Sequence, residues 1–247
     1  MVPERRGKNG MELKSKLSNF WYYHKWKIII GAFFLFVAIL CITQMAGRED
    51  YDMRVLYAGP HIFTGEEVKA VEESFSQLLS KDYNGDGLKN CELRDMTIMT
   101  DAQLSAAIEN AGSAASMVMY NNFSAANMES SFSQEIFAGE NVICLLDPAW
   151  YAKVKESDGF VPLAEVIGKK PEKALDDCSV LLKDTDFAAF FPAFDVFPED
   201  TVLCMRRVST ASVFTGVKKA GERYENHKEI LKKLFAFTLP EDFVPRE

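Results

Sequence analysis

The chain has 247 residues, of which 48% are hydrophobic and 26% charged, a composition that fits one globular unit of one or two lobes plus a further segment. Residues 1–27 carry seven basic and two acidic side chains, a net charge of +5. Because the whole chain carries −8, residues 28–247 carry −13, which argues against a nucleic-acid partner.

The further segment is an apolar run near the N-terminus. Residues 28–46, IIIGAFFLFVAILCITQMA, contain no charged side chain. As a helix they extend about 28 Å, close to the hydrocarbon thickness of a bilayer. Aromatic residues of the kind found at membrane interfaces precede the run, namely Trp21, Tyr22, Tyr23 and Trp26. The sequence therefore predicts a transmembrane helix over residues 28–46.

Charge on the two sides of this helix predicts its orientation. Basic residues favour the cytoplasmic side, so residues 1–27 are expected inside the cell, with a stem at 47–52 and an external domain at 53–247. A cleaved signal peptide is the alternative, but its apolar run is shorter and ends in a small-x-small site that is not clear here. A lipoprotein site at Cys41 is disfavoured because Leu40 precedes it. The prediction is an uncleaved, single-pass anchor in the cell membrane.

The first half of the external domain alternates between strand and helix patterns. Helices are expected from Thr64, which forms a capping-box pattern with Glu67, from Asp101 as a cap, from about residue 124 to 137, and after Asp147-Pro148. Strands are predicted at 53–59, 91–99, 115–120 and 141–147. Four strand–helix units in succession predict an α/β fold with a mostly parallel sheet that is covered by helices on both faces.

The second half of the domain is less regular. Residues 178–183 and 201–208 are predicted to be strands, and residues 221–237 an amphipathic helix, with His227 on its surface. Five phenylalanines lie between the two strands: Phe187, Phe190, Phe191, Phe194 and Phe197. This cluster is expected in the core; if exposed, it would be an apolar patch that meets a partner or the membrane.

Parallel sheets bind ligands at the carboxyl ends of their strands. In this sequence the residues at or near those ends are Tyr57, His61, Tyr120, Asn121, Asn122 and Asp147. Their amide, carboxylate, imidazole and phenol groups suit a small polar solute. The alternative for Asn121 and Asn122 is that they only turn the chain and cap the next helix, and the tyrosines can equally fill the end of the sheet.

Residues 82–93, DYNGDGLKNCEL, match the first half of an EF-hand calcium loop. The side-chain oxygens of Asp82, Asn84 and Asp86 and the backbone carbonyl of Leu88 are the candidate ligands. The second half of the pattern fails, because position 12 is Leu93 where a bidentate glutamate is expected. Asn-Gly and Asp-Gly are also strong turn formers, so a turn without metal remains open. A structural calcium ion is the one cofactor that the sequence suggests.

Four cysteines lie in the external domain: Cys91, Cys144, Cys178 and Cys204. In an oxidising exterior they allow two disulfides in three possible pairings. Cys144 and Cys204 fall within apolar strand patterns, so buried free thiols are the alternative.

Catalysis is not predicted. Phosphate-binding, dinucleotide-binding, zinc-protease and serine-hydrolase motifs do not occur in the sequence. A surface hydrolase that uses His61 is the remaining enzymatic hypothesis, and one histidine is not a site.

Several segments resemble a known group of proteins. They are RVLYAGP (54–60), DYNGDG (82–87), LSAAIENAGSAASMVMYNN (104–122) and QEIFAGENVICLLDPAWYAKV (134–154). Their order after an N-terminal anchor resembles membrane-anchored extracytoplasmic proteins of clostridia-like Gram-positive bacteria, which are related to type II periplasmic solute-binding proteins. The resemblance covers roughly residues 15–155.

The resemblance implies a solute-binding-like external domain whose second lobe is reduced, since about 200 external residues are few for two lobes. The functional hypothesis is capture of a small polar ligand at the outer membrane surface, without chemistry. The alternative is an interaction or scaffold subunit of a membrane complex that has lost its ligand site.

Overall fold

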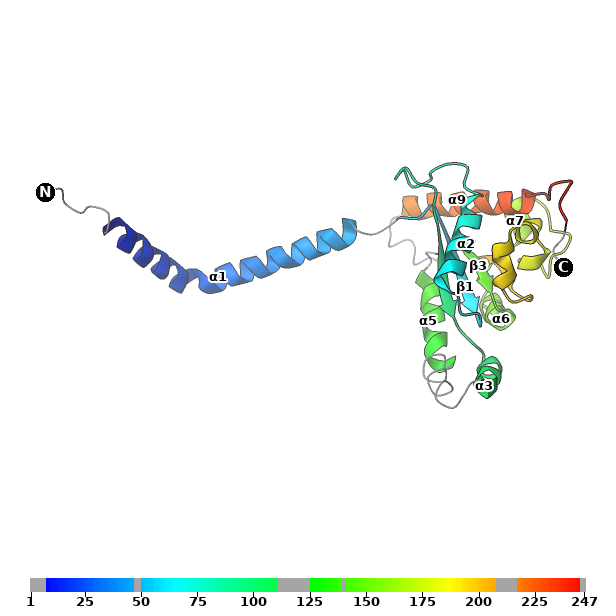
Figure 1. Cartoon of the computed structure of the whole chain (residues 1–247), viewed down its shortest axis with the longest axis horizontal. Coiled ribbons are helices and arrows are strands. Elements are labelled where there is room, and N and C mark those ends of the chain that lie inside the picture. Colours follow the sequence, from blue (N-terminus) through cyan, green and yellow to red (C-terminus); the bar gives the residue numbers. More distant parts are fainter. Residues whose placement is uncertain (1–7, 47–49, 111–124, 139–140, 208–216, 245–247) are drawn as a thin grey trace. The chain divides into compact units, whose positions relative to one another are not determined.

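The computed structural model describes residues 8–46, 50–110, 125–138, 141–207 and 217–244 (Figure 1). The chain divides into two compact units, residues 1–50 and residues 51–247. Tyr120, Asn121 and Asn122 and the strand predicted at 115–120 lie outside the described residues.

The described part of the first unit is one long helix, α1 (Lys8–Ala46), followed by Asp50. Its segment Phe20–Cys41 is the stretch, among the described residues, that is long and apolar enough to cross a membrane, and none of it is buried. This segment begins upstream of the predicted span and includes the interfacial aromatics. A membrane anchor and a signal sequence both have these properties.

The second unit is an α/β domain built from fourteen elements within its described residues. In chain order they are β1 (Met53–Gly59), α2 (Gly65–Ser76), β2 (Cys91–Thr97), α3 (Asp101–Asn110), α5 (Ala125–Ala138), β3 (Ile143–Leu146), α6 (Pro148–Glu156), α7 (Leu163–Ile167), β4 (Ser179–Leu181), the 3₁₀ helix η1 (Leu182–Asp184), α8 (Asp186–Phe190), the 3₁₀ helix η2 (Pro192–Val196), β5 (Val202–Met205) and α9 (Val217–Ala236).

The five strands form one sheet in the order β2-β1-β3-β5-β4. β1 pairs in parallel with β2 and with β3, whereas β5 runs antiparallel to both β3 and β4. Four strands therefore share one direction, which confirms the mostly parallel sheet. The sequence pattern did not reveal that β5 runs the other way, because strand direction depends on the path of the connections.

Helices cover both faces of the sheet (Figure 1). Side chains alternate along β1, so Val55 and Tyr57 enter one core while Leu56 and Ala58 enter the other. The first core is closed by α2, α7, α8 and α9, and the second by α5 and α6. β3 is buried along its whole length, as its continuous apolar sequence predicts.

Helix starts agree with the sequence at two places and differ at a third. Thr64 and Glu67 form the predicted capping box of α2, and Asp147 caps α6 with Pro148 at the first helical position. At α3, however, the cap is Thr100: its hydroxyl accepts from the Gln103 N–H, and the Gln103 side chain accepts from the Thr100 N–H. The prediction of Asp101 as the cap was therefore wrong by one residue.

The phenylalanine cluster lies mainly in the core, as expected. Phe187, Phe194 and Phe197 are buried, whereas Phe190 and Phe191 are partly exposed and contact Phe237 of the segment after α9. The strand predicted at 178–183 is shorter than expected, because the chain turns into η1 at Leu182.

His227 is buried, so its predicted place on the surface of the last helix was wrong. The pairing of β1 with β3 begins at Val55, one residue beyond Arg54. The Arg54 N–H instead donates to Nε2 of His227 at 3.3 Å, so the histidine ring lies against the start of β1.

Candidate functional site

The carboxyl ends of β1, β2 and β3 meet at one edge of the sheet. Gly59 lies opposite Thr97, and Ala58 lies opposite Leu146. From β1 the chain first builds β2 on one side and later β3 on the other, so the direction of strand progression reverses between β1 and β3. Ligand sites of open α/β sheets lie outside the carboxyl ends of the strands at such a reversal. We refer to these strand ends and the segments that follow them as the carboxyl edge.

Tyr57 closes β1 and is fully buried. Its hydroxyl oxygen accepts a hydrogen bond from the His61 N–H at 3.0 Å, and its ring packs edge-on against Phe63 and Phe197. Burial, together with the nearby carboxylates of Asp95 and Asp147, raises the pKa of Tyr57 well above its usual value. The phenol is therefore neutral and fixes the turn that carries His61.

His61 follows the Gly59-Pro60 turn and is partly exposed. Its Nε2 lies 3.6 Å from a carboxylate oxygen of Glu67, and its ring packs against Phe63. Nε2 is buried and makes no hydrogen bond. Hydrogen bonds from the backbone and side chain of Thr64, and the proximity of His61, lower the pKa of Glu67. An imidazole nitrogen beside a charged carboxylate is thus held at the carboxyl edge.

Asp95 on β2 lies opposite Tyr57 in the sheet register. Burial raises the pKa of Asp95, and the nearby His61 and Arg94 oppose that rise. Sequence patterns did not place Asp95 among the ligand residues at the strand ends, because its position beside Tyr57 depends on the register of β1 with β2.

Asp147 follows β3 and is buried. One carboxylate oxygen accepts from the Ala149 N–H at 2.9 Å, and the other accepts from the side-chain amide of Gln103 at 2.7 Å. The Asp147 N–H in turn donates to the Ala58 carbonyl at 2.8 Å. Asp147 therefore ties α3 and α6 to the end of β1, across the point where strand order reverses. Gln103 was missed from sequence, although the T-x-x-Q pattern at Thr100 was a signal that could have placed it at a helix start.

The structure thus brings together three of the six predicted ligand residues, Tyr57, His61 and Asp147, and adds Asp95 and Gln103 to them. Every one of these five side chains comes from the end of a parallel strand or from the segment after it. Together they offer a neutral phenol, an imidazole, two carboxylates and an amide.

The loop at 82–88 is organised around backbone hydrogen bonds. Asp82 accepts from the N–H groups of Gly85 and Gly87, and these bonds lower its pKa. Asn84 accepts from the Asp86 N–H, and Asp86 accepts from the Leu88 N–H. Gly85 and Gly87 both have the positive φ that favours glycine.

The stem holds this loop to the domain. Asp52 is buried, and its Oδ1 accepts from the N–H groups of Tyr83 and Asn84 at 2.7 and 2.9 Å. Within the described ranges, no group of three or more His, Cys, Asp or Glu side chains is arranged to hold a metal ion. Side-chain oxygens of three of the four predicted calcium ligands, Asp82, Asn84 and Asp86, thus accept backbone N–H groups within the turn.

A separate polar cluster surrounds Asp176. Its carboxylate accepts from the Tyr151 hydroxyl, the Ser179 hydroxyl and the Lys155 ammonium group, the last at 2.6 Å. Although burial raises the pKa of Asp176, these bonds and one from the Cys178 N–H lower it to about 2. The cluster ties the segment before β4 to α6.

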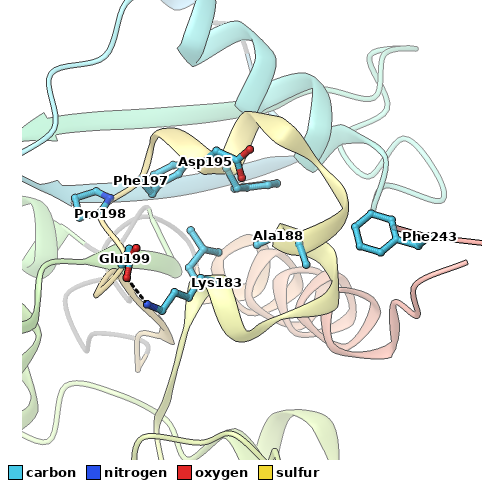
Figure 2. Close-up of a pocket in the computed structure, with 10 residues that line it drawn as sticks. Lys183, Ala188, Asp195, Phe197, Pro198, Glu199 and Phe243 are labelled. Atoms are coloured by element: carbon cyan, nitrogen blue, oxygen red, sulfur yellow. Dashed lines mark hydrogen bonds and ion pairs between the residues drawn. The ribbon is translucent and has the colours of Figure 1, made fainter. Parts of the chain in front are cut away.

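A hollow of about 420 Å³ lies beside α8 and η2 (Figure 2). Its polar rim includes an ion pair between Lys183 and Glu199 at 2.8 Å, and Phe197 forms part of its wall. Because Phe197 also packs against Tyr57, this wall is continuous with the aromatic side chains behind His61.

No known protein family, curated protein or solved structure matches this chain.

Proposed function

We propose that this chain is a single-pass membrane protein whose external α/β domain binds a small polar ligand at the carboxyl edge, without catalysis. The proposal depends on one observation: Tyr57, His61 and Asp147 lie together at the ends of β1 and β3, where strand order reverses. Strand ends at such a reversal form the usual crevice of open α/β sheets.

The orientation follows from charge. The net charge of +5 before the apolar helix favours a cytoplasmic N-terminus, which would put the acidic domain outside the cell. Protease treatment of intact cells tests this point: a C-terminal tag is expected to be lost and an N-terminal tag to be protected.

Residues 51–247 form one compact unit, and its described residues contain one five-stranded sheet. We place this unit with the type II periplasmic-binding-protein-like domains, with the second lobe reduced. A crevice at the edge of one lobe would be shallow, so it would suit a small solute that binds weakly. It would be less suited to a solute that has to be enclosed between two lobes.

Ligand binding is tested by thermal unfolding of residues 50–247 with amino acids, sugars, peptides and small anions. A solute that binds the folded state raises the midpoint by mass action, and we expect one class to do so. His61→Ala is expected to abolish the shift with little loss of stability, because the His61 side chain is partly exposed. Glu156→Ala, an exposed change at the end of α6, is the matched control and should keep the shift.

The second candidate function is an interaction or scaffold subunit of a membrane complex. The observation that favours it is the packing of Phe63, Tyr57 and Phe197 against one another, which fills the space behind His61 with aromatic rings. Absence of a shift with every solute, together with a membrane protein cross-linked to the intact chain, would replace the ligand-binding proposal with this one.

A further inference from the structure

Two cysteines face each other where the sheet changes from parallel to antiparallel. Cys144 of β3 and Cys204 of β5 are directly opposite in the strand register. The sulfur of Cys204 lies 3.7 Å from the carbonyl oxygen of Cys144, so this thiol reaches across to the neighbouring strand. Both residues are fully buried and belong to the same core.

The hydrogen bonds of the two strands define the spacing of this pair. Val142 and Arg206 lie opposite each other just beyond the ends of β3 and β5, in the same register as the cysteines. The Arg206 N–H donates to the Val142 carbonyl at 2.8 Å, so Val142 and Arg206 are a hydrogen-bonded pair. Bonded and non-bonded pairs alternate, so Cys144 and Cys204 are also a bonded pair, with Cα atoms about 5.5 Å apart. Disulfides join residues whose Cα atoms are about 4.4–6.8 Å apart.

The other two thiols of the domain are less well placed. Cys91 lies in the first core, on the opposite face of the sheet from Cys144 and Cys204. Cys178 packs against the same core as Cys204, but Ser179 is the residue directly opposite Cys204. The register therefore favours one pairing among those that the sequence left open.

We propose that Cys144 and Cys204 form a disulfide when the domain folds in an oxidising exterior. Two S–H bonds break and one S–S bond forms, while two protons and two electrons leave. A small-molecule disulfide takes up the electrons and is reduced to two thiols. Because both sulfurs are inaccessible in the folded domain, oxidation takes place during folding, before the core closes.

The bond would connect residues 60 positions apart and lock β5 against β3. Directly opposite Cβ atoms on antiparallel strands are about 4.5–5.5 Å apart, whereas a disulfide prefers about 3.5–4.5 Å. The strands must approach slightly to form the bond, which makes it easier to reduce than an unstrained disulfide. The pair would thus couple the rigidity of the central strands to the redox conditions under which the domain folds.

The test uses the full chain in detergent, unfolded and refolded with glutathione disulfide or with a thiol reductant. The products are denatured, alkylated without reduction and mapped by mass spectrometry. Oxidising refolding is expected to give a linked 144–204 peptide pair, with Cys41, Cys91 and Cys178 alkylated. The oxidised domain should unfold at a midpoint roughly 5–10 °C above that of the reduced domain.

Variants make the result specific. Cys144→Ala and Cys204→Ala should each abolish the difference between the oxidised and reduced midpoints, whereas Cys178→Ala should retain it. Alkylation of all five cysteines after oxidising refolding, or a 178–204 linkage, would overturn the pairing.

The proposal rests on the outward orientation, so cells expressing the native chain are alkylated in parallel with the protease-protection experiment. A linked pair in an externally exposed domain supports it. If the domain is externally exposed and Cys144 and Cys204 are free, the disulfide is refuted and the orientation stands. If the domain is protected from external protease, the outward orientation is refuted, and with it the oxidising environment that the disulfide requires.

Discussion

At the scale of single residues, close contacts at the carboxyl edge explain why one position there has no side chain. Gly59 is the clearest case: a β-carbon at this position would lie 2.6 Å from the Tyr57 hydroxyl oxygen. That hydroxyl accepts from the His61 N–H, so it cannot move away without releasing the turn. The identity of residue 59 is thus determined by Tyr57 and not by its own backbone angles.

We predict that Gly59→Ala destabilises the domain by about 1–3 kcal/mol, since overpacking forces side chains out of their preferred rotamers. Urea unfolding would measure this. Gly65→Ala is the control, because a β-carbon at residue 65 meets nothing within 4 Å and should leave stability almost unchanged. Equal effects of the two substitutions would show that the contact with Tyr57 is not the cause.

His227 gives a second prediction at this scale. Its Nδ1 donates to the Arg223 carbonyl, and its Nε2 accepts from the Arg54 N–H, so the folded domain holds the neutral ring. Burial and the positive charges of Arg223 and Arg54 lower its pKa, while the bond to the Arg223 carbonyl opposes the shift. The unfolded chain therefore binds the proton first, and stability is lost as the pH falls below about 6.5.

Chemical unfolding between pH 7.5 and pH 5 would show this loss. His227→Gln is expected to be less stable at pH 7.5 but to have a weaker dependence on pH, because glutamine does not titrate. A variant with the same pH dependence as the unchanged chain would assign the loss of stability to other groups.

At the scale of elements, side chains that bond to backbone hold the irregular segments in place. Asp52 secures the 82–88 loop, and Arg206 donates to the carbonyls of Asn141 and Ile136, at the end of α5. Burial lowers the pKa of Arg206. In each case a charged side chain forms the hydrogen bonds to backbone groups that a neighbouring turn of helix or strand would otherwise form.

The 82–88 loop leads to a prediction about calcium. Its carboxylate oxygens already accept backbone N–H groups, so we expect millimolar calcium and a chelator to give the same unfolding midpoint. Differential scanning calorimetry of residues 50–247 would measure it. A rise with calcium that Asp86→Ala abolishes would instead establish a structural calcium site formed by Asp82, Asn84, Asp86 and the Leu88 carbonyl.

At the scale of the whole molecule, the chain consists of an apolar helix and an α/β domain that has its own sheet and two cores. The domain begins earlier than β1, because Asp52 holds the loop and its N–H donates to the Asn90 side chain at 3.2 Å. The stem predicted at 47–52 therefore belongs partly to the folded domain.

We predict that residues 50–247 fold cooperatively without the anchor, and that residues 54–247, which lack Asp52 and Met53, unfold at a lower midpoint. Met53 is fully buried and its N–H donates to the Asn90 carbonyl. Circular dichroism during heating would compare the two fragments. Identical midpoints would place the domain boundary after Met53.

The sequence by itself determined what depends on neighbouring residues. The apolar run predicted α1, the Thr64 and Asp147 patterns predicted the starts of α2 and α6, and the continuous apolar stretch predicted β3. Each of these signals lies within a few turns of helix or one strand, where hydrogen bonds and periodicity are local.

The tertiary structure alone decided the features that join distant segments. It reversed β5, buried His227 against Arg54, placed Gln103 on Asp147 and set Cys144 opposite Cys204. These contacts span from 44 to 173 residues along the chain. They depend on strand order and register, which follow from how the whole core packs and not from the pattern of any single segment.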